Sequence, residues 1–236
     1  MKFSNLTNNL NSNLVYSPLM SIPKNSRLIL ALDETDPDKA RAVARAVGGI
    51  VDAIKVNYPL ALSAGLGMVQ ELARSAPIIC DFKVADIPNT NRLIVEQAVK
   101  HGASGIIVHG FVGHDSVEAC VKAAEGADVF VVTEMSHPGG TEFTAKIADQ
   151  LVILAKETKA RGIIAPATRP ERLAELRKLA NDLMILTPGV GAQGGSAADA
   201  ITAGADYIIV GRSIYQAADP RAAAQKLADE IKAALK

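Results

Sequence analysis

The chain has 236 residues, a length that fits one large α/β domain. Hydrophobic residues make up 49% of it, charged residues 21%, and the formal net charge is 0, which suits a globular core and excludes an obvious nucleic-acid or membrane surface. No apolar run approaches the roughly 20 residues of a membrane-spanning helix. Cys80 and Cys120 form no metal-binding pattern, and we expect a reducing, cytoplasmic location.

Residues 1–26 differ in composition from the rest of the chain. They are polar and rich in asparagine, and they contain no apolar core of the kind that a signal peptide needs. No arginine precedes Arg27, which argues against a transit peptide. We therefore predict a flexible N-terminal extension over residues 1–26 and a folded domain over residues 27–236, with Met20 as a possible true start.

From Arg27 onward, short apolar runs alternate with segments of helical pattern. The runs are predicted strands, at residues 27–32, 51–56, 77–80, 105–110, 128–133, 162–167, 183–188 and 207–212. The predicted helices cover residues 37–47, 67–75, 89–101, 115–125 and 196–203, two stripes of apolar residues around 147–154 and 173–179, and a closing helix from residue 220.

These repeated units predict the fold class. Strands that are apolar almost throughout are typical of a parallel sheet covered on both faces. Eight strand–helix units in about 210 residues predict a single-domain α/β fold, the (β/α)8 or TIM barrel. A doubly wound open sheet is the alternative architecture.

The most distinctive stretch is 77–90, read as PIICDFKVADIPNT. Side chains two apart on a strand point to the same face, so Asp81 and Lys83 are predicted to lie side by side. Asp86 follows three residues later, where a loop is expected. This grouping indicates either a catalytic set of charges or a buried ion pair kept for specificity.

Other polar residues also follow the predicted strands, where the active site of a TIM barrel lies. They are Asp33, Lys55, His109, Ser136, Thr187 and Arg212. Taken singly, several have plainer explanations: a loop cap for Asp33, a snorkelling side chain for Lys55, and structural histidines for His109 and His137. No cluster has metal-ligand spacing, although acidic residues at several strand ends could still bind magnesium.

Two glycine-rich loops indicate a phosphate site. PGVGAQGG follows the seventh predicted strand, and GRSIY follows the eighth, with Arg212 at the start of a predicted short helix whose dipole favours an anion. Glycines let backbone N–H groups approach an anion closely, and this pair of loops is a frequent phosphate site in TIM barrels.

At this point the chain resembles a known family. DFKVADIPNT is similar to the signature of orotidine 5′-phosphate decarboxylase, Asp-x-Lys-x-x-Asp followed by Ile-Pro-x-Thr. LALD, IKVNYP, IIVHGF, TEMSHPG, TRPERL, TPGVGAQGG and IIVGRSIY resemble the family's other strand ends in the same order, across residues 27–236. The Asp-x-Lys-x-x-Asp core also occurs in magnesium-dependent 3-keto-gulonate 6-phosphate decarboxylases, but TEMSHPG and GAQGG favour the orotidine branch. Ala167 offers no hydroxyl and is assigned no role.

The resemblance implies a carboxy-lyase that converts orotidine 5′-monophosphate to UMP and carbon dioxide, the last step of de novo pyrimidine nucleotide synthesis. It implies no metal and no cofactor, so fixed charges must stabilise the carbanion at carbon 6. By resemblance, Lys83 is the proton donor to carbon 6 and Asp81 lies near the departing carboxylate. Asp86 completes the network, while Lys55 and Asp33 hold that network and the ribose hydroxyls.

The resemblance also implies the rest of the binding site. Ser136 would hydrogen-bond the pyrimidine amide edge, residues 189–195 would close as a lid, and the phosphate would be bound by Gln193, Gly211 and Arg212. The remaining substrate-binding residues implied are Ile87, Pro188 and Thr90. A homodimer is implied as well, with Asp86 and Thr90 shared across its interface. Two alternatives stay open, the magnesium-dependent decarboxylase and a non-catalytic nucleotide-binding barrel.

Overall fold

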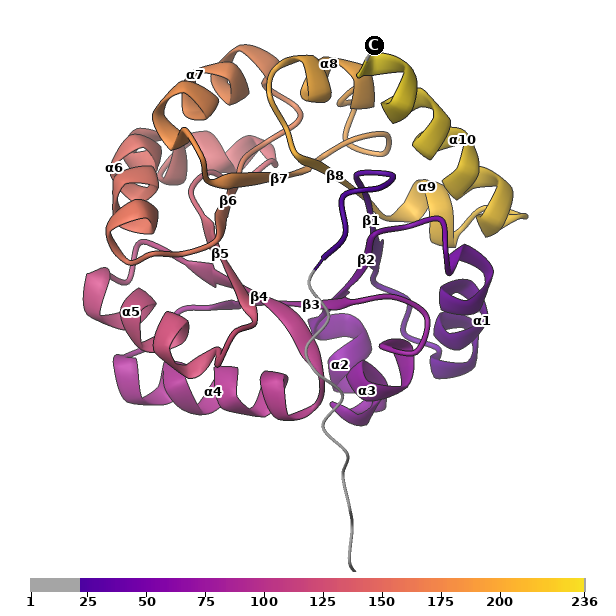
Figure 1. The fold of residues 1–236 in the computed structure, drawn as a ribbon, viewed down its shortest axis with the longest axis horizontal. Helices are drawn as coiled ribbons and strands as arrows, with labels where there is room; N and C mark the ends of the chain where they lie inside the picture. The colour runs from indigo at the N-terminus through magenta and orange to yellow at the C-terminus, as the bar shows by residue number, and fades with distance from the viewer. Residues whose placement is uncertain (1–21, 236) are drawn as a thin grey trace, which may run out of the picture.

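A computed structural model describes residues 22–235, and within them eight parallel strands close into a barrel. Each strand pairs with the next along the chain, and β1 pairs with β8 to close the ring. Figure 1 looks along the barrel axis and shows the strands as an inner ring with the helices around it. The prediction of a TIM barrel is confirmed, and the open-sheet alternative is wrong because an open sheet has no β1–β8 pairing.

The elements follow in regular alternation. The strands are β1 (Leu28–Leu32), β2 (Ala53–Asn57), β3 (Ile78–Val84), β4 (Ala103–His109), β5 (Asp128–Val132), β6 (Gly162–Ile164), β7 (Met184–Pro188) and β8 (Tyr207–Val210). The helices are α1 (Pro37–Val47), α2 (Tyr58–Ala64), α3 (Gly67–Leu72), α4 (Pro88–Lys100), α5 (His114–Ala123), α6 (Thr144–Glu157), α7 (Pro170–Ala180), α8 (Ala197–Thr202), α9 (Arg212–Tyr215) and α10 (Pro220–Ala234), with a 3₁₀ turn, η1 (Pro138–Thr141), before α6.

The strands are apolar on both faces because both faces are buried. Alternate residues such as Ile29 and Ile79 fill the barrel interior, and their neighbours Leu28 and Ile78 pack outward beneath the helices. The two clusters together bury the strands on both sides, as a parallel sheet requires. Gly162 shows how closely the strands approach, since a Cβ there would lie 2.3 Å from the carbonyl oxygen of Met184.

Helix boundaries follow local capping signals. The side chain of Asp36 accepts hydrogen bonds from the backbone N–H groups of Asp38 and Lys39 at the start of α1. Asp219 accepts one from Ala222 at the start of α10. Each of these caps precedes a proline in the first turn, where a missing N–H costs nothing, and the predicted starts of both helices are confirmed.

One helix was not predicted. The predicted helices leave residues 57–66 without one, but α2 covers Tyr58–Ala64, with Asn57 accepting a hydrogen bond from the Tyr58 N–H. Pro59 lies in the first helical turn, where proline favours the start of a helix and does not interrupt it.

The segment just before β1 covers the N-terminal end of the barrel. The Tyr207 hydroxyl donates to the carbonyl oxygens of Ile22 and Pro23, and the Ile22 side chain is buried in the interior cluster. Asp52 accepts hydrogen bonds from the backbone N–H groups of Asn25, Ser26 and Arg27. Residues 22–26 of the predicted extension therefore pack against the barrel, and residues 1–21 lie outside the described part of the chain.

Within residues 22–235, none of the helices combines the length and the apolar character that crossing a membrane requires.

Candidate active site

A cavity of about 350 Å³ opens where the strands end at their carboxyl side. Side chains from almost every strand end line it, including the predicted residues Asp33, Lys55, Asp81, Lys83, Ser136, Pro188, Gln193, Gly211 and Arg212. The structure therefore brings together in one cavity residues that are up to 179 positions apart in the sequence, counted from Asp33 to Arg212.

Four of these residues form a row of alternating charge across the cavity floor. The Lys55 ammonium lies 3.8 Å from Asp33 Oδ1 and 2.9 Å from Asp81 Oδ2. The Lys83 ammonium lies 2.9 Å from Asp81 Oδ1. Asp81 and Lys55 are each only 5% exposed, so the middle of the row is shielded from solvent and keeps much of its electrostatic strength, while Asp33 and Lys83 at its ends are partly exposed.

Lys83 is held in an unusual backbone conformation. Its φ is +42°, in the left-handed region that residues other than glycine rarely adopt. The register between β3 and β4 shifts between Cys80 and Val84, so the strand bulges at Lys83. Strain of this kind is found mostly at functional sites, where the surrounding structure holds it in place. The predicted side-by-side placement of Asp81 and Lys83 is present, but on a bulge and not on a regular strand.

The two lysines stabilise the charged form of Asp81. Burial disfavours its carboxylate, but the attraction of Lys55 and Lys83 and their hydrogen bonds outweigh that cost, and the pKa of Asp81 lies below its usual value. Asp81 is therefore a carboxylate at neutral pH, in a position facing the cavity.

Two groups near the row have unused hydrogen-bonding capacity. Asp33 Oδ1 is buried and has no hydrogen-bond partner among the described residues, which leaves it able to accept one from a ligand. His109 Nδ1 is in the same condition. Burial and the nearby Lys83 charge lower the pKa of His109 to about 4, so its ring is neutral at pH 7. The ring contacts that of Phe111 in a tilted arrangement, with the centroids 4.7 Å apart.

The glycine-rich loop after β7 borders the opposite side of the cavity. Gly189, Gly191 and Gly194 all have positive φ, and the loop closes on itself through a hydrogen bond from the Gly191 N–H to the Gly195 carbonyl. Gln193 from this loop and Arg212 from the start of α9 both line the cavity. Thr187, another predicted polar strand-end residue, is buried outside the cavity lining.

Three predicted substrate-binding residues lie outside this cavity. Asp86, Ile87 and Thr90 stand at the beginning of α4, where Asp86 and Ile87 are exposed. The Asp86 carboxylate accepts only from the Ile87 N–H among the described residues, and its own N–H donates to Asn91. Within a single chain these residues do not join the charged row.

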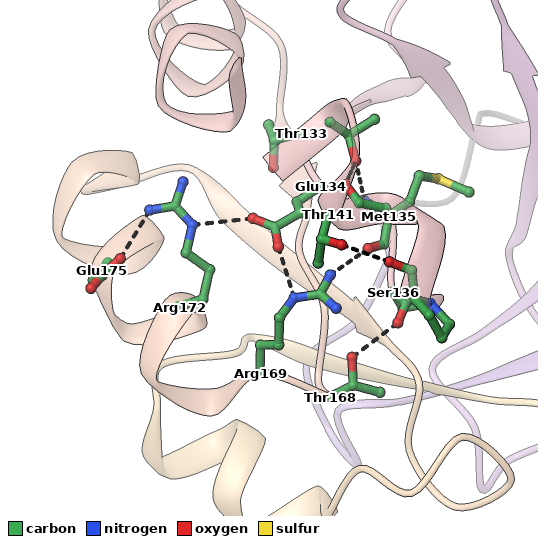
Figure 2. Close-up of polar contacts among 12 residues, drawn as sticks. Thr133, Glu134, Met135, Ser136, Thr141, Thr168, Arg169, Arg172 and Glu175 are labelled. Carbon is green, nitrogen blue, oxygen red and sulfur yellow. Dashed lines mark hydrogen bonds and ion pairs between the residues drawn. The ribbon is translucent and has the colours of Figure 1, made fainter. Parts of the chain in front are cut away.

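The sequence analysis missed a second charged network beside the cavity, drawn in Figure 2. Glu134 follows β5, is 1% exposed, and accepts hydrogen bonds from Arg169 Nε at 2.8 Å and Arg172 Nε at 3.1 Å. Arg169 also donates to the Met135 carbonyl oxygen, and Thr168 donates to that of Ser136. The TRPERL and TEMSHPG segments contained these residues, but nothing in their local pattern indicated the pairing.

Within the described residues, no group of three or more histidine, cysteine, aspartate or glutamate side chains is arranged to hold a metal ion. Cys80 packs in the outer core, and burial, with a further effect from Asp81, raises the pKa of its thiol to about 12.

Comparisons with known proteins agree closely with one another. The model of the orotidine 5′-phosphate decarboxylase / HUMPS family matches residues 26–227. Orotidine 5′-phosphate decarboxylase of Methanococcoides burtonii is 57% identical over 88% of this chain and 98% of its own length, and that of Thermococcus kodakarensis is 53% identical over 87% and 97%. The structure resembles that of orotidine 5′-monophosphate decarboxylase from Methanocaldococcus jannaschii complexed with the inhibitor BMP, with a TM-score of 0.83, 48% identity, and coverage of 86% of this chain and 97% of that one.

Proposed function

The chain belongs to the orotidine 5′-phosphate decarboxylase / HUMPS family, and on that basis we propose how its residues carry out the reaction. It is an enzyme of pyrimidine nucleotide synthesis that decarboxylates orotidine 5′-monophosphate to UMP and carbon dioxide. The observation that carries the assignment of roles is the charged row Asp33–Lys55–Asp81–Lys83 on the cavity floor, with Lys55 and Asp81 buried at its centre.

Lys83 donates the proton that replaces carbon dioxide. Loss of carbon dioxide leaves an electron pair at carbon 6, which the pyrimidine π-system does not delocalise. An ammonium beside that carbon stabilises the developing negative charge and then protonates it. Bonds from the Lys83 ammonium to both oxygens of Asp81, at 2.9 and 3.0 Å, fix its position without a ligand.

Asp81 lies beside the substrate carboxylate and places a second negative charge near it. Two like charges in a shielded site raise the energy of the bound carboxylate, and that repulsion disappears as neutral carbon dioxide leaves. Lys55 lies 2.9 Å from Asp81 Oδ2 and keeps the aspartate in place. Asp33 Oδ1, which is buried and has no partner among the described residues, accepts a hydrogen bond from a ribose hydroxyl.

The remaining residues hold the two ends of the nucleotide. Ser136 bonds the pyrimidine amide edge, with Pro188 in contact beside it. Gln193, Gly211 and Arg212 bind the phosphate, and residues 189–195 close over it as a lid. Gly211 has no room for a side chain without a shift, since a Cβ there would lie 3.2 Å from the Ala31 carbonyl oxygen. Binding energy from the distant phosphate then contributes to ordering the reacting end.

Asp86, Ile87 and Thr90 serve the site of a second copy of the chain. The exposure of Asp86 and Ile87 supports this assignment. So do exposed apolar side chains before α4, in α4 and in the loop between β4 and α5, with Ile87 at 64%, Leu93 at 46% and Phe111 at 55% exposure. An isologous dimer through this surface would cover the apolar side chains and would contain two composite sites.

Subunit mixing tests the shared site. Lys83→Ala and Asp86→Ala proteins, each nearly inactive, are combined and allowed to exchange subunits. In a mixed dimer one site receives both defects and the other receives neither, so after random exchange roughly a quarter of all sites are intact. Activity should rise toward that fraction. If mass spectrometry confirms exchange and activity stays at the parental level, Asp86 acts within its own chain.

Turnover of orotidine 5′-monophosphate by the purified protein in EDTA, followed by absorbance, tests the function itself. We expect full activity in the chelator. Loss of activity that magnesium restores would favour the 3-keto-gulonate 6-phosphate type of enzyme, while tight nucleotide binding without turnover would indicate a non-catalytic barrel.

A further inference from the structure

We propose that Glu134 is a positioning residue for the pyrimidine end of the site. It acts through Arg169, whose guanidinium holds the loop between β5 and α6 that carries Ser136. This inference rests on the proposed role of Ser136 at the pyrimidine amide edge, and Figure 2 shows the residues concerned.

The Glu134 carboxylate is held in a fixed position. It is 1% exposed and receives one guanidinium at each oxygen, Arg169 at Oε1 and Arg172 at Oε2. Its backbone is tied to the barrel as well, since the Glu134 N–H donates to the Ile164 carbonyl of β6. A buried carboxylate with two charged donors has little freedom to move, and it orients whichever group it binds.

Arg169 connects the fixed Glu134 carboxylate to the loop between β5 and α6. Arg169 uses Nε for Glu134 and Nη2 for the Met135 carbonyl oxygen, at 2.8 and 2.5 Å. The planar guanidinium fixes the angle between these two bonds, so an anchored Nε defines where Met135 must lie. Thr144 Oγ1 accepts from the Met135 N–H on the other side, so this peptide is held at both its N–H and its carbonyl.

Ser136 connects this loop to the substrate-binding cavity. Ser136 is the next residue, its carbonyl accepts from Thr168 Oγ1 at 3.0 Å, and its side chain lines the cavity. Gly189, where the lid begins, packs against the same place, since a Cβ there would lie 3.0 Å from Thr168 Cγ2 and 3.5 Å from Ser136 Cβ. Displacing this loop would therefore misplace the hydroxyl meant for the pyrimidine ring.

Arg172 offers a matched control. It binds the same carboxylate as Arg169, but its other bonds go to Asp149 on α6 and Glu175 on α7, both exposed and outside the loop. Arg169→Met and Arg172→Met each take one guanidinium from Glu134 and should destabilise the fold to a similar degree. Only Arg169→Met also releases Met135.

The experiment compares two ligands, UMP and ribose 5-phosphate, which lacks the pyrimidine. We expect Glu134→Gln and Arg169→Met to weaken UMP binding about tenfold or more and to lower kcat/KM for orotidine 5′-monophosphate by up to about 10²-fold, because small displacements cost this much. Binding of ribose 5-phosphate should stay unchanged in both variants. Arg172→Met should bind UMP as the unmodified protein does, and Glu134→Gln combined with Arg169→Met should be no worse than Arg169→Met alone.

Three outcomes would overturn the proposal. They are equal losses for UMP and ribose 5-phosphate, equal losses in Arg169→Met and Arg172→Met, or additive losses in the double variant. If Glu134→Gln does not fold, the two arginine variants still decide the question. Failure of the unmodified protein to turn over orotidine 5′-monophosphate would instead contradict the proposed function, which separates the two cases.

Discussion

The two ends of the barrel each contain a buried aspartate, and the two carboxylates are held in opposite ways. Asp52, 2% exposed at the N-terminal end that residues 22–26 cover, is bound by three backbone N–H groups, those of residues 25–27. Asp81, 5% exposed at the open end, is bound by the ammonium groups of Lys55 and Lys83. One carboxylate is thus held by fixed dipoles of the main chain, and the other by the charges of two lysine side chains.

The pKa values of the two carboxyl groups are shifted in opposite directions. Burial raises the pKa of Asp52 above its usual value, although the backbone N–H groups of Arg27, Ser26 and Asn25 oppose the rise. At Asp81 the lysines outweigh burial and the pKa is lowered. Backbone donors suffice to fasten a chain segment, whereas paired charges beside a cavity provide a field that a substrate experiences. Burial of a carboxylate alone therefore does not mark an active site, and the nature of its donors separates the two cases.

The largest expected effect comes from the open end. Lys83→Ala removes the proton donor, so turnover should fall by at least about 10³-fold, since both acid catalysis and charge stabilisation are lost. Nucleotide binding should persist because the phosphate-binding residues are untouched. Stopped-flow or steady-state absorbance gives the rate, and calorimetry with UMP gives the affinity. A variant that retains a tenth of the turnover would remove Lys83 from its role.

Arg212→Ala tests whether the open end works through the distant phosphate. We expect kcat/KM for the nucleotide to fall about 10²-fold, the cost of a charged hydrogen bond or two, and to change far less for the truncated nucleoside. The nucleoside has no phosphate to lose, so it serves as the internal control. Equal losses on both substrates would make Arg212 a structural residue.

Truncation addresses the N-terminal end of the barrel. A protein that starts at Met20 keeps Ile22 and the contacts of residues 25–27 with Asp52, so it should fold and turn over normally. A protein that starts at Arg27 loses the buried Ile22 and its neighbours, and its free energy of unfolding should fall by about 3 kcal/mol. Urea unfolding measures both. A clear loss in the Met20 protein would show that earlier residues contribute to stability.

The effect that is smallest at neutral pH concerns His109, whose pKa of about 4 lies below the ordinary 6.5 because the ring is buried near Lys83. Between these two pH values the unfolded chain binds more protons than the native one, so the free energy of unfolding falls as the pH drops from about 6.5 to about 4. The contribution is at most about 1.4 kcal/mol per pH unit. In urea titrations at several pH values, His109→Gln should have a shallower slope; identical slopes would contradict the assignment.

The sequence was most informative for features that a short stretch of chain determines by itself. Apolar runs predicted every strand of the barrel, and the polar residues that follow them predicted most of the cavity lining, because strand ends of a TIM barrel converge. The left-handed backbone at Lys83 was not predictable, since lysine has no preference for it and the neighbouring strand imposes it.

Other features depended on contacts between distant parts of the chain. Glu134 and Arg169 are 35 positions apart, and their pairing exists only because β5 and β6 are neighbours in the barrel. The burial of Ile22 likewise depends on its contact with the interior cluster of the folded barrel. Composition alone had placed this residue in a polar extension. Asp86, Ile87 and Thr90 were grouped with the site by resemblance alone, and one chain does not bring them into its cavity.

The two buried aspartates differ in that Asp81 serves the reaction whereas Asp52 serves only stability, and paired variants of the two distinguish these roles. Asp81→Asn and Asp52→Asn are isosteric changes of the same kind, and kcat/KM and the free energy of unfolding are measured for both. We predict that both lose stability, by about 1–3 kcal/mol, because each leaves buried donors facing an amide. Only Asp81→Asn should lose kcat/KM, by about 10³-fold, with Asp52→Asn unchanged per folded molecule. Activity losses that simply follow stability in both variants would contradict the account.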